Sequence, residues 1–425
     1  MFKLKEHGTN VRTELLAGLT TYMTMVYIAF VNPAILADAG MDHGAVFVAT
    51  CLAAAFGSAL MGLYANLPIA LAPGMGLNAY FTYTVVKGEA IPWEAALAAV
   101  FASGVLFLIV SVTPLRRWII DSISKSQKLA ISVGIGFFLI IIGLQGAGFI
   151  AADPATLVQL GNLKSPGIAI AATAFILMAA LDARRVPGAI LIGIIFAYLA
   201  ALLFGLTPVS AIASAPPSIA PVFLKLDLAA LWNLAMLPIV LTFLFIVLFD
   251  NTGTLIGVAR AAGLTRPDGS FPGLERALVV DSASTMAGAA LGTSTTTSYI
   301  ESAAGVNAGG RTGLVAITVA ALFLVTLVFA PLAGSIPAFA TAPALIFVGC
   351  LMTTGARDID FDDATEFVPA AITIIAMPLT FSIADGIGFG FIAYAGIKLL
   401  AGRWSELPAA VLVLAAIFVL RFALL

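Results

Sequence analysis

Four carboxylates lie within, or at the edge of, long apolar stretches of the sequence. They are Asp250 in LFIVLFDNTGTLIGVA, Asp281 in VVDSASTMAG, Glu301 in GTSTTTSYIES and Asp385 in FSIADGIGFG. A charge at the centre of a bilayer costs about 3 kcal/mol or more, so each is a candidate for function if these stretches span a membrane. No Lys or Arg lies in the middle of the stretches around Asp250 and Glu301. Unpaired buried bases favour a cargo that donates hydrogen bonds or is a cation, and argue against an inorganic anion.

We therefore expect Asp250 and Glu301 to bind substrate and, if transport is coupled to protons, to carry the proton. Asp281 lies near the start of its span, where helix capping and lining of the site are both compatible with its position. Asp385 falls between two apolar segments, where a turn is the expected role. The sequence alone does not say which carboxylate takes the proton.

Composition supports the membrane assignment and excludes other classes. The chain has 425 residues, of which 61% are hydrophobic and 10% charged, and its mean hydropathy is +1.10; a soluble protein has about a quarter of its residues charged. The net charge of −2 gives no case for nucleic-acid binding. His7 and His43 fall in predicted loops, and Cys51 and Cys350 have no metal-ligand spacing. We expect no enzyme activity, no cofactor and no metal site.

The apolar segments predict an all-α polytopic membrane protein with about fourteen spans. These fall at 14–36, 44–64, 67–86, 92–113, 129–150, 166–182, 187–206, 235–259, 276–291, 294–309, 312–333, 337–355, 367–384 and 386–401, with one more apolar piece at 406–424. With the N-terminus as a retained cytoplasmic tail, 16 of the 20 Lys and Arg residues, including Arg116, Arg117 and Arg266, fall on the cytoplasmic side. This bias matches the positive-inside rule and predicts a multi-pass protein of the cell membrane.

Two spans depart from simple helical character and match each other in position. An offset of 223 residues aligns Gly40 with Gly263, Tyr27 with Asp250, and Asn78 with Glu301. Seven spans per half is an odd number, so the two halves must be inverted repeats. Spans three (LPIALAPGMGLNAYF) and ten (GTSTTTSYIES) each predict an extended piece followed by a short helix, because Pro and Gly stop helices and Ser and Thr side chains satisfy freed backbone groups.

Two such half-helices would point at one place near the middle of the membrane and form a site for a small polar molecule. Glu301 would accept hydrogen bonds from the cargo, supported by backbone amides near Gly76 and Tyr299, with Ser298 beside them. The segment from Met75 to Asn78 would form the opposite wall. Tyr27, Tyr80 and Phe81 would offer rings for stacking, although packing is the ordinary role of such residues.

Several segments resemble the AzgA-like purine permeases, a branch of the nucleobase–ascorbate transporters. They are TTYMTMVYIAFVNPAIL (20–36), ANLPIALAPGMGLNAYF (65–81), LFDNTGTLIGVA (248–259), GTSTTTSYIESAAGVNAGGRTGL (292–314) and IIAMPLTFSIADGIGFGFIAYAGIKLL (374–400). By motif position, the resemblance places the family's substrate carboxylates on Asp250 and Glu301 and its span-three asparagine on Asn78. Asp385 stands where the family pattern leads us to expect Asn.

The resemblance implies two inverted seven-helix repeats divided into a core and a gate. The core would comprise spans 1–4 (residues 1–113) and 8–11 (211–333), and the gate spans 5–7 (114–210) and 12–14 with the terminal segment (334–425). It further implies import of adenine, guanine or hypoxanthine by proton symport and alternating access of a rocking or elevator type, with a homodimer through the gate as a possible assembly. The alternatives are another cargo, such as uracil, xanthine or an inorganic anion, and a passive channel.

Overall fold

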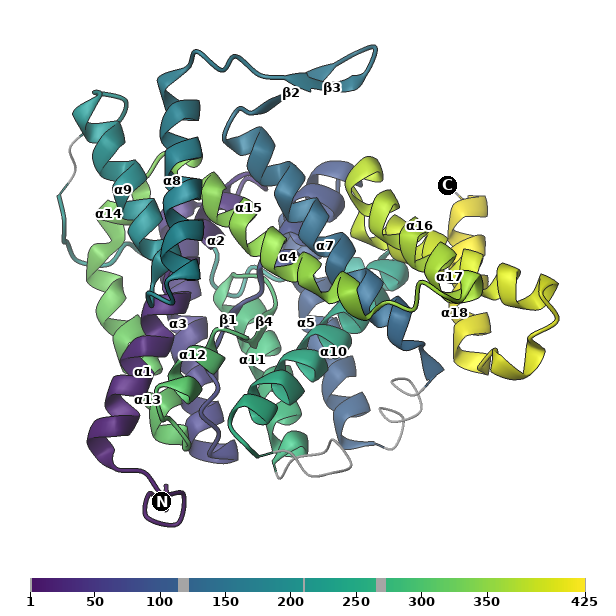
Figure 1. Cartoon of the computed structure of the whole chain (residues 1–425), viewed down its shortest axis with the longest axis horizontal. Coiled ribbons are helices and arrows are strands. Elements are labelled where there is room, and N and C mark those ends of the chain that lie inside the picture. The colour runs from purple at the N-terminus through teal and green to yellow at the C-terminus, as the bar shows by residue number, and fades with distance from the viewer. Residues whose placement is uncertain (1, 114–121, 209–210, 265–272, 425) are drawn as a thin grey trace.

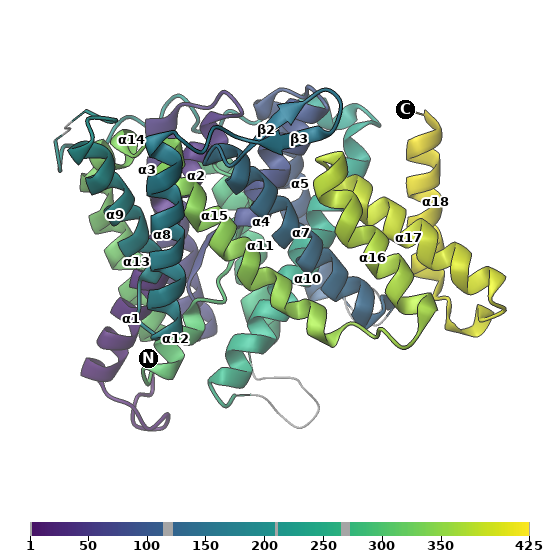
Figure 2. The same ribbon diagram turned by 45° about the horizontal axis from the view of Figure 1, so that its top comes forward.

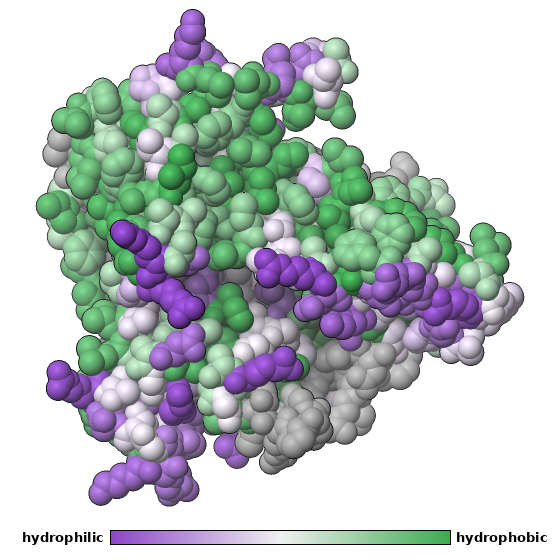
Figure 3. Space-filling view, in the orientation of Figure 1, coloured by the Kyte–Doolittle hydropathy of each residue, from purple (hydrophilic) through white to green (hydrophobic). Residues whose placement is uncertain are grey.

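The computed structural model describes residues 2–113, 122–208, 211–264 and 273–424 (Figure 1). Arg116, Arg117 and Arg266 lie outside the described residues, as do the expected core–gate boundaries near 114 and 210. Within the described part, nine helices are long and apolar enough to cross a membrane, and three shorter apolar helices accompany them. Figure 3 shows that apolar residues cover most of the face it displays. The predicted polytopic helical fold is therefore confirmed.

The first half of the chain builds seven predicted spans. Its elements are α1 (Val11–Met25), α2 (Ile28–Ala37), α3 (His43–Leu60) with a π-helical end (Met61–Ala65), β1 (Leu71–Pro73), α4 (Met75–Ala79) with a π-helical continuation (Tyr80–Gly88), α5 (Trp93–Val112), α7 (Lys125–Gly146), α8 (Pro166–Ala183) and α9 (Ala189–Leu203). Asn10, Asp42 and Ser124 accept backbone N–H groups at the starts of α1, α3 and α7, which satisfies donors that a helix leaves free. Side-chain caps thus set the starts of three of the spans.

The second half repeats this order and adds one helix. Its elements are α10 (Met236–Ala261), α11 (Leu274–Leu291), β4 (Thr296–Ser298), α12 (Ser302–Asn307), α13 (Gly313–Thr326), α14 (Ala330–Ser335), α15 (Ala338–Thr353), α16 (Ala364–Thr380), α17 (Ile383–Leu400) and α18 (Ala409–Leu424). In Figure 2, α1 and α2 rise from the end where the N-terminus lies, whereas α10 descends toward that end. The predicted terminal segment 406–424 is thus a helix of its own, α18.

Strands β1 and β4 join the two halves at the centre of the molecule. They pair antiparallel, with Leu71 opposite Ser298, Ala72 opposite Thr297 and Pro73 opposite Thr296. We call β1 with α4 the first crossing and β4 with α12 the second crossing. Pro68, Pro73 and Gly74 interrupt helical structure in the first crossing, because proline lacks the N–H that a helix interior needs. The extended pieces predicted in spans three and ten are therefore present and face each other.

The helices pack in two groups. Helices α3, α5, α11 and α13 pack on one another, with α1, α2 and α10 against them, whereas α7 packs on α15 and α16, α8 on α9 and α15, and α16 on α17. The first group holds both strand–helix crossings. Helix α18 packs mainly on α17 and stands at the edge of the second group (Figure 2).

The structure corrects four details. A β-hairpin, β2 (Ile150–Asp153) with β3 (Leu157–Leu160), follows α7 where no strand was predicted. The Asp153 carboxylate stabilises its turn, because Oδ1 accepts the backbone N–H groups of residues 155 and 156. His43 begins α3 and is not in a loop. Asp385 lies in the first turn of α17 and not in a turn between helices.

The fourth correction concerns the repeat offset. Strand β4 begins 225 positions after β1, at Thr296 against Leu71, and helix α12 begins 227 positions after α4, at Ser302 against Met75. The two additional positions arise because three residues link β4 to α12 whereas Gly74 alone links β1 to α4. Asn78 is thus the fourth residue of its helix, while Glu301 precedes its helix by one position. These two residues are not at equivalent places in the repeat.

Candidate functional site

The backbone of the crossing is supported by hydroxyl groups from neighbouring helices. Ser58 of α3 accepts the Leu71 N–H at 2.9 Å and donates to the Leu71 carbonyl at 3.1 Å. Ser302 accepts the N–H of residue 70, and Thr285 of α11 donates to the carbonyl of residue 296, both at 3.0 Å. Because hydrocarbon offers no partners to free backbone groups, these hydroxyls allow an extended chain to lie inside the protein at membrane depth.

Glu301 lies at the start of α12 and is half-buried. The Tyr27 hydroxyl, at the break between α1 and α2, donates to Glu301 Oε1 at 2.8 Å. Tyr27 is 1% exposed, so its ring is held by packing and its hydroxyl orients the carboxylate. The aromatic side chain that the sequence suggested for stacking thus acts on Glu301 through its hydroxyl. The bond at Oε1 thereby sets the direction of the second carboxylate oxygen, Oε2.

Asp250 lies in the middle of α10 and is also half-buried. Helix α10 packs on α11, β4 and α12, the elements that carry or adjoin Asp281, Tyr299 and Glu301. Among the ion pairs of the described residues, none includes Asp250 or Glu301. The structure thus brings the two carboxylates into one neighbourhood without a cation.

The sequence analysis expected backbone amides near Gly76 and Tyr299 to support Glu301, and for Tyr299 the structure shows a different partner. The Tyr299 N–H donates to the carbonyl of Ala70 at 3.0 Å, so this amide is engaged in the crossing. The Tyr299 hydroxyl donates to the Pro73 carbonyl at 2.5 Å. Gly76 is half-buried in the first turn of α4, and a Cβ there would collide with Ile135 of α7. Helix α4 therefore approaches α7 through a glycine, at the contact between the two groups of helices.

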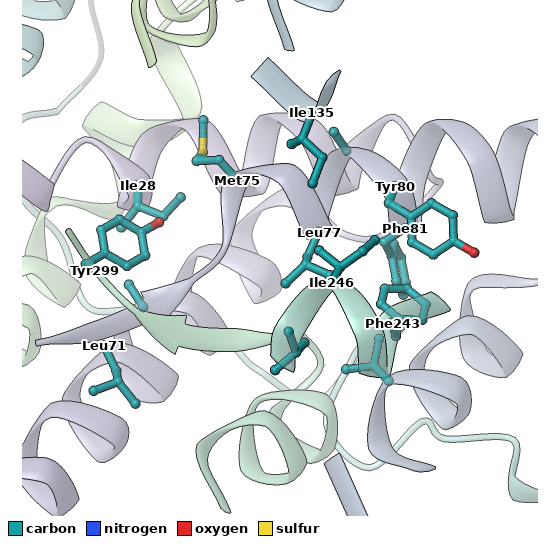
Figure 4. Close-up of a cluster of buried hydrophobic side chains, with 14 of the residues drawn as sticks. Ile28, Leu71, Met75, Leu77, Tyr80, Phe81, Ile135, Phe243, Ile246 and Tyr299 are labelled. Atoms are coloured by element: carbon teal, nitrogen blue, oxygen red, sulfur yellow. The ribbon is translucent and has the colours of Figure 1, made fainter. Parts of the chain in front are cut away.

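Asn78 is fully buried and faces the second crossing. Its Oδ1 accepts a hydrogen bond from Ser294 Oγ at 2.5 Å, and its Nδ2 has no partner among the described residues. Leu77 lies beside it in the same helix, and Figure 4 shows Leu77 directed toward Ile246 of α10. Asn78 thus links α4 to the Ser/Thr run that precedes β4, and its side-chain hydrogen bond goes to Ser294 and not to Glu301.

Met75, Tyr80 and Phe81, which were also predicted to line the site, are buried by packing against neighbouring side chains. Met75 is 6% exposed, and Tyr80 packs edge-on against Phe243 with ring centroids 4.8 Å apart (Figure 4). Phe81 is fully buried. Tyr80 and Phe81 therefore have the packing role that is ordinary for aromatic residues.

Ser298, predicted as a site residue, holds a buried carboxylate. Its hydroxyl donates to Asp281 Oδ1 at 2.8 Å, and Asp281 is fully buried in α11. Asp281 thus lines the crossing from behind β4. Asp385 lies away from this group, 3.3 Å from Arg421 of α18.

One buried polar residue beside the second crossing, Asn32, was not predicted from the sequence as part of the site. Asn32 of α2 is fully buried and donates to the hydroxyls of Thr50 and Thr293 at 2.7 and 2.9 Å. The available signal was an amide directly before Pro33 in an apolar span. An uncharged side chain carries a smaller burial cost than a carboxylate, so the cost argument did not select it. In the described part of the chain, no group of three or more His, Cys, Asp or Glu could hold a metal ion.

Sequence comparison decides the family. The Xan_ur_permease model, described as a permease family, matches residues 12–389. The chain belongs to this permease family. It is 52% identical to putative permease MJ0326 of Methanocaldococcus jannaschii, over 100% of this chain and 98% of that protein. It is 47% identical to adenine permease AdeP of Escherichia coli, over 99% and 95%. It is 43% identical to guanine/hypoxanthine permease PbuO of Bacillus subtilis, over 100% of both chains.

A solved structure shows the same fold. The transmembrane domain of the cyanobacterial bicarbonate transporter BicA matches with a TM-score of 0.64 and 17% identity, over 91% of this permease and 97% of that chain. The resemblance to AzgA-like permeases is confirmed by the relatives, and the core–gate fold by this transporter. The permease is a membrane transporter and not an enzyme.

Proposed function

We propose that this permease imports purine nucleobases by proton symport. The observation that carries the proposal is the pair Asp250 and Glu301, two half-buried carboxylates on packed elements, neither of which forms an ion pair within the described residues. Purine bases carry ring N–H donors, and adenine and guanine carry an exocyclic amino donor as well; carboxylates accept hydrogen bonds from both kinds of donor. The named activities of AdeP and PbuO, adenine and guanine/hypoxanthine permeation, agree with this cargo.

The two carboxylates take different parts in the proposed mechanism. Tyr27 occupies Glu301 Oε1, so Glu301 presents Oε2 to the ring N–H of the base. Asp250, in the middle of α10, accepts a second donor or binds the coupling proton. A base moving with one proton carries one positive charge inward, so both the proton gradient and a negative interior drive uptake.

Alternating access would move one group of helices past the other. We assign residues 1–113 and 211–333 to the core, which carries both crossings, and 114–210 and 334–425 to the gate. Support comes from the packing of α3, α5, α11 and α13 as one group and of α7, α15, α16 and α17 as another. The contact between Gly76 and Ile135 lies on the seam between them. The proposed orientation keeps the N-terminus cytoplasmic.

Uptake into proteoliposomes tests the proposal. The reconstituted protein takes up labelled adenine, guanine or hypoxanthine saturably when the outside is more acidic, and a protonophore removes the accumulation. Competition by unlabelled purines, uracil and xanthine then ranks the cargo. Absence of gradient-driven uptake of all three purines would contradict the proposal.

Two control measurements separate the alternatives. Glu275, an exposed glutamate in the first turn of α11, gives the matched variant Glu275→Gln, which keeps normal uptake while Glu301→Gln loses it. Counterflow exchange of preloaded base is expected of a carrier, whereas single-channel currents would indicate a passive channel. The fold shared with a bicarbonate transporter makes bicarbonate a useful competitor, and we expect it to have no effect.

A further inference from the structure

The additional helix α18 carries a single charged side chain, Arg421, in an otherwise apolar sequence. The Arg421 side chain is only 10% exposed, and its Nη2 lies 2.8 Å from Glu89 Oε1 and 3.3 Å from Asp385 Oδ1. A cation within an apolar segment is costly unless it is paired, so these contacts account for its place. One guanidinium therefore joins two carboxylates.

The two carboxylates belong to the two groups of helices. Glu89 directly follows the helix of span three, which begins at α4, whereas Asp385 lies in the first turn of α17. A second contact crosses the same seam, because Thr84 Oγ1 donates to the Phe381 carbonyl at 3.1 Å. The C-terminal end of α18 lies at the face opposite the N-terminus (Figure 2). Arg421 thus bridges core and gate on that face.

Helix α18 is fastened to α17 and not to span three. Phe422 stacks on Phe389 with ring centroids 4.9 Å apart. Gly388 permits close approach, since a Cβ there would lie 2.7 Å from the Phe418 ring. Because α18 packs mainly on α17, it stays with α17 when core and gate move relative to each other, and the contact between Arg421 and Glu89 breaks together with the one between Thr84 and Phe381.

We infer that Arg421 is a clasp between Glu89 and Asp385 that holds the carrier closed at the face opposite its N-terminus. The inference rests on the alternating access proposed above, and it gives α18 a role in setting the balance between the two conformations. The clasp forms only in the state described by the structure, so it stabilises that state against the one open at this face. Removing the charge shifts the population toward the open state.

Thiol labelling measures this shift without using any cargo. Thr84 is 3% exposed at the contact between core and gate, so a cysteine placed there by Thr84→Cys reports whether this contact opens. The two native cysteines are replaced by Cys51→Ala and Cys350→Ala so that only the new thiol reacts. A membrane-impermeant maleimide is applied to right-side-out and to inside-out vesicles. Arg421→Met should raise the labelling rate from one side about fivefold, the scale of a partly exposed ion pair. Leu420→Met, a neighbouring lipid-facing position that is 60% exposed, is the matched control and leaves the rate unchanged.

Single-partner variants keep the test decisive if Arg421→Met does not fold. Glu89→Gln retains the bond between Arg421 and Asp385 and should raise labelling as Arg421→Met does, because it removes the contact that has to break. Arg421→Lys should restore part of the protection. Equal labelling in Glu89→Gln and Leu420→Met would overturn the clasp and leave Arg421 as a static ion pair.

The two proposals fail in different measurements. If the wild type takes up no purine but Arg421→Met and Glu89→Gln still raise labelling, the cargo is wrong and the clasp stands. If purine uptake is present and labelling is the same in every variant, the clasp is wrong and the cargo stands.

Discussion

In the first crossing, β1 is the apolar segment Leu71–Pro73, and Gly74 alone leads into a helix that continues to Gly88. In the second, β4 is the hydroxyl-rich segment Thr296–Ser298, and three residues lead into a helix of six. The crossings share a backbone plan and pair with each other, yet the first contains a fully buried amide, Asn78, and the second a half-buried carboxylate, Glu301. The two repeats thus share the strand–helix backbone that forms the centre of the molecule, whereas only the second crossing places a carboxylate, Glu301, between its strand and its helix.

The glycines of the two short helices also face different neighbours. A Cβ on Gly305 of α12 would lie 2.5 Å from the Ala17 carbonyl oxygen of α1, within one group of helices, whereas a Cβ on Gly76 of α4 would meet a side-chain methyl of α7 in the other group. A backbone atom in a packed core cannot yield, while the end of a side chain can. The second crossing is therefore fixed to its own group, and the first touches the opposite group.

The largest expected effect is on folding of the second crossing. Gly305→Val forces α12 away from Ala17 and should destabilise the protein by about 3 kcal/mol. Thermal unfolding in detergent, followed by the loss of monodisperse protein, measures this. Gly334→Val, at a glycine with nothing near its Cβ position, is the control. Unchanged stability of Gly305→Val would show that α12 is not packed on α1 in this way.

Next in size is the loss of the carboxylate. Glu301→Gln keeps the shape of the side chain and removes its charge, and the uptake efficiency should fall about a hundredfold, as expected for a hydrogen bond to a charged group. The initial rate of adenine uptake across a range of concentrations gives the value. In Asn78→Ala the loss should be smaller, because Asn78 bonds to Ser294. An equal loss in both variants would contradict the asymmetry of the two crossings.

A smaller effect is expected at the contact between the first crossing and α7. Gly76→Ala should leave the protein folded but slow uptake about tenfold, because Ile135 has to move by about a methyl group to admit the new Cβ. Ile135→Ala combined with Gly76→Ala should restore most of the rate. The double variant thus tests whether the contact itself, and not α4 alone, limits transport. No recovery would place the effect elsewhere.

The smallest effect is expected at the tyrosine that orients Glu301. Tyr27→Phe removes one hydroxyl and should raise the KM for the base about fivefold, the scale of one hydrogen bond, with little change in the maximal rate. Tyr64→Phe, at an exposed tyrosine, is the control. If Tyr27→Phe binds the base as well as the wild type does, the hydroxyl does not position Glu301 for cargo.

The site residues that carry charge were predictable, whereas their partners were not. Burial cost selects four carboxylates, and position within the span together with the absence of a nearby Lys or Arg narrows these to Asp250 and Glu301. The bond from Tyr27 to Glu301 joins residues 274 positions apart, and periodicity within a span contains no information on such pairs. The same holds for Ser298 and Asp281, whose adjacency depends on how β4 lies over α11.

The spans themselves were predictable from apolar length, with limits that have physical causes. The offset of the repeat drifts because the links between strand and helix differ in length, which a single alignment of sparse residues does not show. Arg421 was visible in the sequence as a lone charge in the terminal apolar segment. Its meaning depends on Glu89 and Asp385, which lie more than 30 positions away and in the two different groups of helices.

The pairing of β1 with β4 also sets an order for biogenesis. Leu71–Pro73 leave the ribosome long before Thr296–Ser298, so the first crossing enters the bilayer without its partner strand. Until the second arrives, the N–H and C=O groups at the edge of β1 depend on local hydroxyls such as Ser58, a costly condition in hydrocarbon. Chains truncated before residue 296 should therefore be insertion products that cellular quality control recognises and degrades, even though more than half of the described helices are already made.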